Sequence, residues 1–254
     1  MSSPFPILRH ADVPPDSIPT GERLLDRSLR PFLAWVPAAK TIVLGNSQDP
    51  ERELNVEAVL RDGIPVFKRM SGGGAVLLSP GCVCLGLRFT KGKDLSIHDY
   101  FAKGSALITE VAAEKLGLEL RLRGTSDLAC LGPLGTEAAL GEKLAETGGS
   151  GEGTLERKVA GCALYMPRDF VLYLVSILVD PDFSDMETYL AHPSKEPGYR
   201  GGRTHRDFLA GLGPLSGKPL EPADLAGWLQ RKIPAMPGLD LDWELCPEKP
   251  GIRA

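Results

Sequence analysis

Residues 67–81 read FKRMSGGGAVLLSPG and place three consecutive glycines, Gly72, Gly73 and Gly74, between a basic pair and an apolar run. Glycine interrupts a strand and loses much conformational entropy on folding, so packing alone does not explain a triplet. The usual reasons are a tight turn or a backbone that closely approaches a ligand. Converging N–H groups beside Lys68 and Arg69 suit a bound phosphate, although glycine-rich hairpin corners also occur for structural reasons.

The residues that follow the triplet exclude two familiar nucleotide-binding turns. A P-loop requires a Gly-Lys-Ser/Thr sequence and a helix directly after the turn, and neither is predicted here. The spacing of the glycines also departs from the G-x-G-x-x-G pattern of dinucleotide-binding folds.

Apolar and β-branched runs on both sides of the triplet predict strands. The segments at 65–69, 75–79 and 83–89 read as a β-meander with the triplet at its first corner. The segments at 158–166 and 169–180 read as a hairpin turned by Pro167 and Arg168. Further strands are expected at 41–45, 119–123 and 127–131, with an exposed strand at 239–245.

Helices are fewer, and the clearest is 96–117, which Ser96 can cap and Gly117 can end. Residues 50–63 predict another helix, from Pro50 to the stop at Gly63. Shorter helices are expected at 21–30 and around 184–191, 205–211 and 222–231. Strands that outnumber helices and come in adjacent pairs indicate an α+β fold with a mixed, mainly antiparallel sheet flanked by helices.

The domain organisation follows from length and local composition. The 254 residues suit one large domain or two small ones. Residues 1–20 are rich in proline and polar groups and are expected to be irregular, and 21–254 are expected to form a single domain. The segment 132–155, rich in Gly, Glu, Leu and Ala, is interpreted as a mobile insertion.

Charge and hydropathy narrow the function classes. A net charge of −4 argues weakly against broad nucleic-acid binding, and the expectation is no nucleic-acid partner. No run approaches the roughly 18 apolar residues of a membrane span, so no membrane association is expected. The first residues contain no apolar signal core, which makes the cytoplasm the expected location.

The five cysteines indicate neither a disulfide framework nor a metal site. Their number is odd, and in a cytosolic protein of this size disulfides are not expected. Cys82 and Cys84 would point to the same face of a strand, where packing is the simpler interpretation. With only four dispersed histidines there is no convincing zinc pattern, so no protein-held metal is predicted.

A second candidate for chemistry is Lys158, in the stretch ERKVAG (156–161). A lysine at the start of a strand is most often a solvated charge. If it points into a pocket instead, its ammonium suits a phosphate or a carbonyl oxygen that develops negative charge. Spacing alone leaves both interpretations open.

The combination of these motifs resembles the lipoate-protein ligase A type of the biotin/lipoate protein ligase family. The resemblance covers roughly residues 20–180, and SDL (126–128) and RKVAGCA (157–163) extend it beyond the glycine turn. The matched positions of the first block are Gly45, Asn46, Gln48, Glu53, Asn55, Lys68, Arg69, Ser71, Gly72, Gly73, Gly74, Ala75 and Val76.

The resemblance implies a fold similar to class II aminoacyl-tRNA and biotin synthetases and a catalytic domain of the ligase type. Lys158 would be the catalytic residue that contacts the acyl carbonyl and the phosphate. Residues that would bind the substrate or its adenylate are Asn46, Arg69, Ser71, Gly72, Gly73, Gly74, Ala75, Val76 and Gly161, and Val76 would line a tunnel for an eight-carbon chain.

The implied reaction is the ATP-dependent activation of lipoate or octanoate as acyl-AMP, followed by acyl transfer to a lysine of a lipoyl domain. ATP and Mg²⁺ are implied, with Mg²⁺ held mainly by phosphate oxygens. The acceptor would be an H-protein or a 2-oxoacid dehydrogenase E2 type protein. Single-chain ligases carry a C-terminal accessory domain that this chain is expected to lack, so a separate small accessory subunit, or a lid formed by 132–155, is implied.

Departures from the family keep two other functions open. Leu78 and Ser79 stand where relatives have a histidine and an aspartate, which leaves a non-catalytic protein that binds an acyl group or a lipoyl domain. A cofactor-independent octanoyl- or lipoyltransferase would need an activated cysteine thiolate. The B-type transferase has that cysteine where this chain has Phe170, and Cys130 is the candidate nucleophile of another transferase branch.

Overall fold

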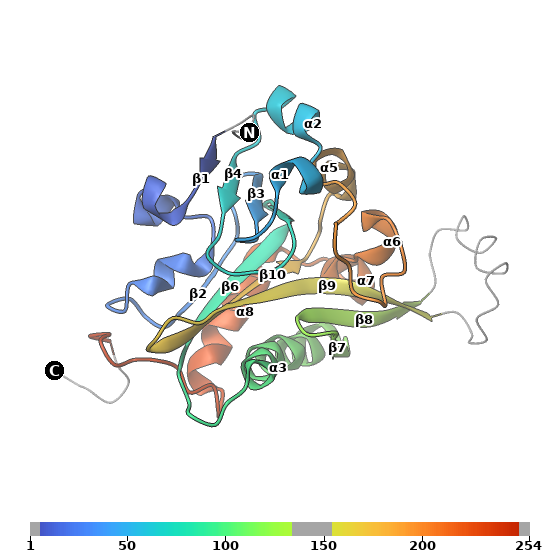
Figure 1. Cartoon of the computed structure of the whole chain (residues 1–254). Coiled ribbons are helices and arrows are strands. Elements are labelled where there is room, and N and C mark those ends of the chain that lie inside the picture. The colour runs from blue at the N-terminus through green and yellow to red at the C-terminus, as the bar shows by residue number, and fades with distance from the viewer. Residues whose placement is uncertain (1–5, 134–153, 249–254) are drawn as a thin grey trace.

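The computed structural model describes residues 6–133 and 154–248 and arranges their strands in two sheets (Figure 1). The large sheet has six strands in the order β2-β6-β10-β9-β8-β7, each antiparallel to its neighbours. These strands are β2 (Phe32–Trp35), β6 (Cys82–Thr90), β7 (Leu120–Arg123), β8 (Asp127–Pro133), β9 (Thr154–Tyr165) and β10 (Phe170–Leu178).

The small sheet has the order β1-β4-β3-β5, with β1, β4 and β3 parallel and β5 antiparallel to β3. Its strands are β1 (Ile7–Leu8), β3 (Thr41–Leu44), β4 (Val66–Lys68) and β5 (Val76–Leu78). Antiparallel pairs predominate over the two sheets together, so the predicted α+β class with a mixed, mainly antiparallel sheet is confirmed.

Helices cover both sheets. The α-helices are α1 (Pro50–Glu53), α2 (Val56–Arg61), α3 (Ile97–Leu116), α5 (Phe183–Tyr189), α6 (His205–Phe208), α7 (Leu212–Ser216) and α8 (Pro222–Lys232). Short 3-10 helices are η1 (His10–Asp12), η2 (Pro15–Ser17), η3 (Gly21–Leu25) and η4 (Ile233–Ala235). None of the helices in the described ranges is long and apolar enough to cross a membrane.

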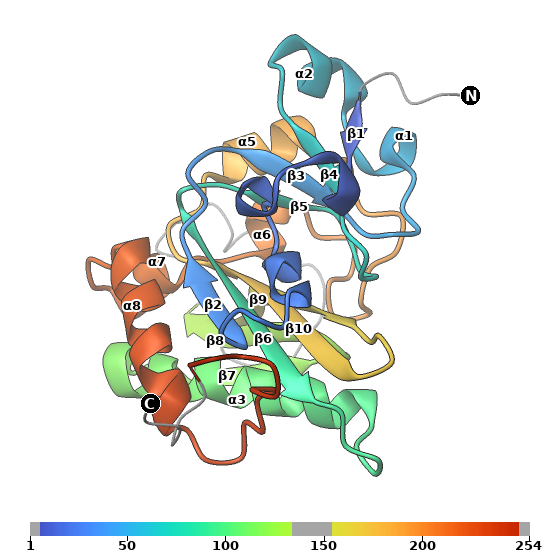
Figure 2. The ribbon, with the colours of Figure 1, turned by 90° about the vertical axis from the view of Figure 1, so that its left-hand side faces the viewer.

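The main core lies between the large sheet and helices α3 and α8, which cover one of its faces (Figures 1 and 2). The predicted ends of α3 are confirmed: Ser96 accepts the N–H of Asp99, and Gly117 follows with a φ of 71°. Leu107 and Val111 on this helix pack with Leu85 of β6, all about 1% exposed or less. A second core packs the small sheet against α2 and α5.

The hairpin predicted around Pro167 is confirmed, since β9 and β10 pair with Leu172 opposite Tyr165. The predicted β-meander is wrong. β4 and β5 do not pair with each other, because β3 lies between them and pairs with both. The glycine triplet is therefore a loop that crosses the end of β3, and β6 belongs to the other sheet.

The predicted helix 50–63 is interrupted after Glu53. Leu54 forms a bridge with Leu190, and the N–H of Asn55 donates to the carbonyl of Tyr189 at 2.9 Å. These hydrogen bonds to the end of α5 replace the helical ones, so the segment forms two short helices. Tertiary contacts that the sequence pattern does not reveal override the helix signal here.

Other expectations need smaller corrections. The predicted strand 239–245 forms only one bridge, Leu241 with Phe89. The segment 1–20 is not irregular throughout, because Ile7–Leu8 forms β1, and 21–30 contains only the 3-10 helix η3. The ends of the expected insertion belong to β8 and β9, and its remaining residues, 134–153, lie outside the described residues.

Candidate active site

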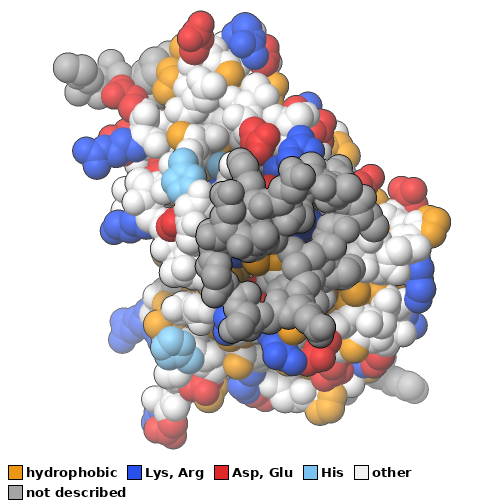
Figure 3. Space-filling model, turned by 90° about the vertical axis from the view of Figure 1, so that its right-hand side faces the viewer, with side chains coloured by type: hydrophobic (Ala, Val, Ile, Leu, Met, Phe, Trp, Pro, Cys, Tyr) orange, Lys and Arg blue, Asp and Glu red, His pale blue; other side chains and the backbone are white. Residues whose placement is uncertain are grey.

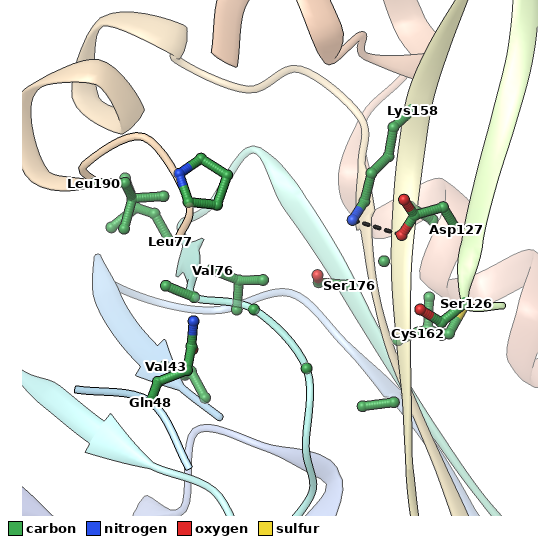
Figure 4. Close-up of a pocket in the computed structure, with 18 of the residues that line it drawn as sticks. Val43, Gln48, Val76, Leu77, Ser126, Asp127, Lys158, Cys162, Ser176 and Leu190 are labelled. Atoms are coloured by element: carbon green, nitrogen blue, oxygen red, sulfur yellow. Dashed lines mark ion pairs between the residues drawn. The ribbon is translucent and has the colours of Figure 1, made fainter. Parts of the chain in front are cut away.

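A cleft of about 930 Å³ lies between the two sheets. Figure 4 shows Val43 and Val76 of the small sheet on one side of it, and Lys158 and Asp127 of the large sheet on the other. The apolar part is lined by side chains from both sheets and from α5, among them Trp35, Val43, Val76, Leu77, Leu78, Leu85, Leu174, Met186 and Leu190.

The polar part of the cleft is richer in positive than in negative side chains, although the chain as a whole has a net charge of −4. A concave site with an excess of one sign of charge attracts ligands of the other sign. The basic lining residues are Arg52, Arg69, Arg123, Lys158, Lys195 and Arg200, and the acidic ones are Asp49, Glu53 and Asp127.

The glycine turn forms the small-sheet wall, and Arg69 holds it in shape. The Arg69 guanidinium is buried and donates to the carbonyls of Gly72 at 2.7 Å, Gly74 at 2.9 Å and Val43 at 3.4 Å. Burial lowers the pKa of Arg69 to about 10, and the charge of Glu22 counteracts this effect. Arg69 therefore bonds to the loop itself, and the groups that the turn offers to the cleft are those of its backbone.

The three glycines of the turn differ in what requires them. Gly73 has a φ of 99°, which favours glycine, and its carbonyl lies 2.1 Å from where a Cβ on Gly45 would be. Gly45 must therefore be glycine for the turn to pack on the end of β3. Gly72 and Gly74 have ordinary φ values and open space around a built Cβ, so local packing does not require them. Small residues there leave the turn's backbone uncovered.

Lys158 projects from β9 into the cleft, and its Nζ lies 2.7 Å from Oδ1 of Asp127 on β8 (Figure 4). The other carboxylate oxygen of Asp127 accepts from the hydroxyl of Tyr199 at 3.0 Å. A Cβ on Gly161 would lie 2.9 Å from Nζ of Lys158, so glycine lets the lysine lie across the strand. The lysine is thus positioned in the cleft rather than solvated at a strand end.

The structure brings most of the expected site residues to the cleft. Those that line it are Arg69, Gly73, Gly74, Ala75, Val76, Lys158 and Gly161. Ser71, Gly72 and Asn46 do not line it, although the N–H of Asn46 donates to the carbonyl of Ser71 at 2.9 Å and fixes the turn against β3. Ligand contacts by any of these residues stay a prediction.

Cys130 lies elsewhere, in the core formed with α3. It is 3% exposed, does not line the cleft, and burial raises the pKa of its thiol. Cys84 and Cys162 do line the cleft, but burial raises the pKa of Cys162 to about 11 and that of Cys84 well above its ordinary value. A thiolate nucleophile needs the opposite environment, with its pKa lowered by nearby positive charge.

Among the cleft residues that the sequence analysis does not predict as site residues are Asp127, Arg200 and His205. Asp127 lies within the SDL motif (126–128), so the family resemblance already marks its position as a candidate site residue. Arg200 and His205 lie in the segment 192–212, where the likeness to the family is loose. Burial, together with the charges of Arg200, His192 and Lys158, lowers the pKa of His205 to about 4, so this imidazole is neutral near pH 7.

On the face shown in Figure 3, acidic and basic side chains are interspersed with hydrophobic ones over the visible described surface. No basic stripe of the kind that tracks a nucleic-acid backbone runs across this view of the described residues.

Comparison with known sequences identifies the chain's relatives. The sequence profile of the lipoyl protein ligase A/B catalytic domain matches residues 21–233. The protein named "Probable lipoate-protein ligase A" in Mycoplasma pneumoniae is 27% identical over 152 residues, which are 60% of this chain. That alignment spans only 37% of the relative's own length.

Solved structures share the fold at low sequence identity. A structure from work on a bi-partite lipoate protein ligase and its E2 lipoyl domain in Thermoplasma acidophilum superposes with a TM-score of 0.62 at 18% identity. The match covers 84% of this chain and 75% of that one. A lipoate-protein ligase A bound with ATP gives a TM-score of 0.60 at 17% identity, with 84% and 77% of the two chains covered.

Proposed function

The chain belongs to the lipoyl protein ligase A/B catalytic domain family, and we propose that it is an ATP-dependent lipoate- or octanoate-protein ligase. It would join the acid to ATP as acyl-AMP, release pyrophosphate, and pass the acyl group to a lysine amine with release of AMP.

One observation carries this proposal: a single cleft combines the apolar part described above with a positively charged part, and Lys158 lies in the positively charged part. The apolar part of the cleft, which is lined by Val43, Val76 and Leu174 among others, suits the carbon chain of the acid. Burying that chain contributes about 0.8 kcal/mol per CH₂ group. The cationic part suits the carboxylate and the phosphates, and so the ends of an acyl-adenylate match the two parts of the cleft.

Lys158 has the position and charge to act during both steps. Its ammonium can stabilise negative charge on the acyl carbonyl and on the phosphate, because a fixed cation in a partly enclosed cleft needs little reorganisation. Asp127 holds Nζ and fixes where this charge lies. The backbone of the glycine turn would supply N–H groups to the phosphate from the opposite wall.

The substrates and partners follow from the same reaction. ATP would bring Mg²⁺ held mainly by phosphate oxygens, and lipoate or octanoate would be the acid. The acceptor would be a lipoyl domain of an H-protein or of a 2-oxoacid dehydrogenase E2 type protein. The similar ligase of T. acidophilum is described as bi-partite and as having an E2 lipoyl domain, which supports both this acceptor and a separate small accessory subunit.

The cysteine environments speak against the thioester transferase. Cys130 is buried away from the cleft, and burial raises the pKa values of Cys84, Cys130 and Cys162.

The direct test is acylation of a purified lipoyl domain, measured as an increase in mass. The full chain, Mg²⁺ and octanoate or lipoate would be incubated with and without ATP, and with and without a candidate accessory subunit. We expect modification only with ATP and only when the acceptor lysine is present, with an acceptor Lys→Arg variant as control. Modification from an octanoyl thioester without ATP would establish the transferase instead, and binding without modification would establish a non-catalytic protein.

A further inference from the structure

Arg200 lies in the segment between α5 and α6, lines the cleft and is only 5% exposed. Its Nε donates to the carbonyl of Arg203 at 2.9 Å and lies 3.3 Å from a carboxylate oxygen of Glu196. Its guanidinium lies over the ring of Phe208, 4.9 Å from the ring centre. Within 6–133 and 154–248, neither terminal nitrogen of Arg200 has a hydrogen-bond partner, and Nη2 is fully buried.

The other two buried arginines show how this fold normally satisfies such a group. Both terminal nitrogens of Arg69 donate to backbone carbonyls of its own loop and of β3. Those of Arg88 donate to carbonyls that include Leu24 at 2.8 Å and Leu29 at 3.0 Å. A guanidinium carries four N–H groups on its terminal nitrogens, and a buried donor without an acceptor is unfavourable. Arg200 is thus a buried cation with unused donors at a cleft.

The corner around Arg200 is positively charged beyond this one side chain. The pKa of His205 is lowered by burial and then by the charges of Arg200, His192 and Lys158. These three groups therefore lie close enough to His205 for their charges to reach it. Two acidic side chains act on Arg200, and both are shared: Asp127 pairs with Lys158, and Glu196 also accepts from the N–H of Gly202 at 2.9 Å and contacts His192. The corner retains positive charge that suits a ligand with more than one negative charge.

We propose that Arg200 is a phosphate-anchoring residue, which binds phosphate oxygens of the nucleotide from the wall opposite the glycine turn. A guanidinium fork binds phosphate through two parallel N–H···O bonds, a geometry that lysine cannot reproduce. The nucleotide rests on the proposed ligase function, whereas the anion site itself rests on Arg200 and its surroundings. The ligand class is a polyphosphate, as free pyrophosphate or as part of ATP.

The test uses inorganic pyrophosphate as the probe and the full purified chain, with binding measured by titration calorimetry. Arg200→Met removes the charge and keeps an apolar stem over Phe208. Arg206→Met is the matched control, because Arg206 is exposed, lies next in sequence to His205 and does not line the cleft. We expect Arg200→Met to weaken pyrophosphate binding by at least about tenfold and Arg206→Met to leave it unchanged.

A second variant has the opposite expected sign, which a folding defect does not imitate. Glu196→Gln removes the carboxylate that faces Nε of Arg200, and should tighten pyrophosphate binding several-fold. Parallel titrations with AMP and ATP show which phosphates are held: a larger Arg200→Met effect with ATP than with AMP supports anchoring beyond the α-phosphate. No binding by the unmodified protein, or equal binding by Arg200→Met, would overturn the proposal.

The outcomes separate this inference from the proposed function. If pyrophosphate binds through Arg200 but no acyl-dependent reaction with ATP occurs, the anion site stands and the ligase proposal fails. If ATP-dependent acylation proceeds and Arg200→Met matches the unmodified protein in pyrophosphate affinity and in KM for ATP, the ligase proposal stands and the Arg200 inference fails.

Discussion

The two walls of the cleft contain one buried arginine each, and the two arginines are used in opposite ways. On the small-sheet wall, the terminal nitrogens of Arg69 bond to carbonyls of Gly72, Gly74 and Val43. On the other wall, those of Arg200 bond to no group among the described residues, and Lys158 is paired only with Asp127. The wall formed by the glycine turn and Arg69, here called the shaped wall, is fixed by its own hydrogen bonds. The wall that contains Lys158 and Arg200, here called the charged wall, keeps cationic groups available for a ligand.

The difference shows what a sequence motif does and does not encode. The glycine turn is easy to recognise because its conformation requires particular residues, such as Gly45 and Gly73. On the opposite wall, Arg200 has no comparable requirement on its local sequence, since its role depends on which side chains tertiary folding leaves without partners.

Removing the cation from the charged wall should have the largest effect. Lys158→Ala is expected to lower the rate of acylation by roughly 10²–10³-fold, because a fixed charge near the developing negative charge is lost. We also expect the melting temperature of this variant to fall, because Asp127 would remain buried without its ion-pair partner.

The double variant Lys158→Ala/Asp127→Asn separates the two consequences, since it leaves no unpaired charge. We expect its melting temperature to recover towards that of the unmodified protein while acylation stays low. Recovery of the rate together with stability would show that Lys158 is structural.

Changing the shaped wall should affect folding rather than chemistry. Gly45→Ala places a Cβ 2.1 Å from the carbonyl oxygen of Gly73. Neither atom can move away by a side-chain rotation, because the oxygen belongs to the backbone and the Cβ is attached directly to it. We expect a loss of about 3 kcal/mol and a decrease in melting temperature of roughly 6–12 °C.

Gly72→Ala, with no atom within 4 Å of its built Cβ, is the control, and its melting temperature should hardly change. Equal melting temperatures for the two variants would contradict the view that the packing of the turn on β3 requires Gly45.

The pH dependence of stability should report the burial of His205 and, after it, the positive charges around this imidazole. Because the pKa of His205 is about 4 in the folded protein, against about 6.5 when unfolded, the unfolded chain binds more protons between these values. The contribution of His205 to stability is therefore lost as the pH falls from about 6.5 towards 4.

His205→Gln should flatten this part of the curve by roughly 1–3 kcal/mol, the lower figure allowing for solvent screening of a partly exposed imidazole. The measurement is thermal unfolding of both proteins at a series of pH values. Parallel curves for the two proteins would show that the pKa of His205 is the same in the folded and unfolded protein.

The smallest effect on acylation is expected for a residue of the core under the large sheet, outside the cleft. Cys130→Ser should retain acylation within about threefold, because Cys130 lies in the core and not in the cleft. The rate of acylation and the formation of a hydroxylamine-sensitive adduct are the measurements. Complete loss of transfer by a folded variant would point to a thioester mechanism.

The predictable parts of the fold are those with local signals. The ends of α3 follow from Ser96 and Gly117, and the β9–β10 hairpin follows from two apolar runs around Pro167. The meander was predicted wrongly because strand order depends on pairing with β3, which the residues around the triplet do not encode. Arg200 was missed for a related reason: whether a guanidinium is buried and has partners depends on tertiary structure.

If this cleft activates an acid with ATP, the reversal of that step is measurable as isotope exchange between ATP and pyrophosphate. The unmodified chain, with a candidate accessory subunit if needed, should exchange label between ATP and pyrophosphate only when lipoate or octanoate is present. Lys158→Ala should lose the exchange and Cys130→Ser should keep it. Acylation of a lipoyl domain without any acid-dependent exchange, or loss of exchange in Cys130→Ser alone, would contradict the account.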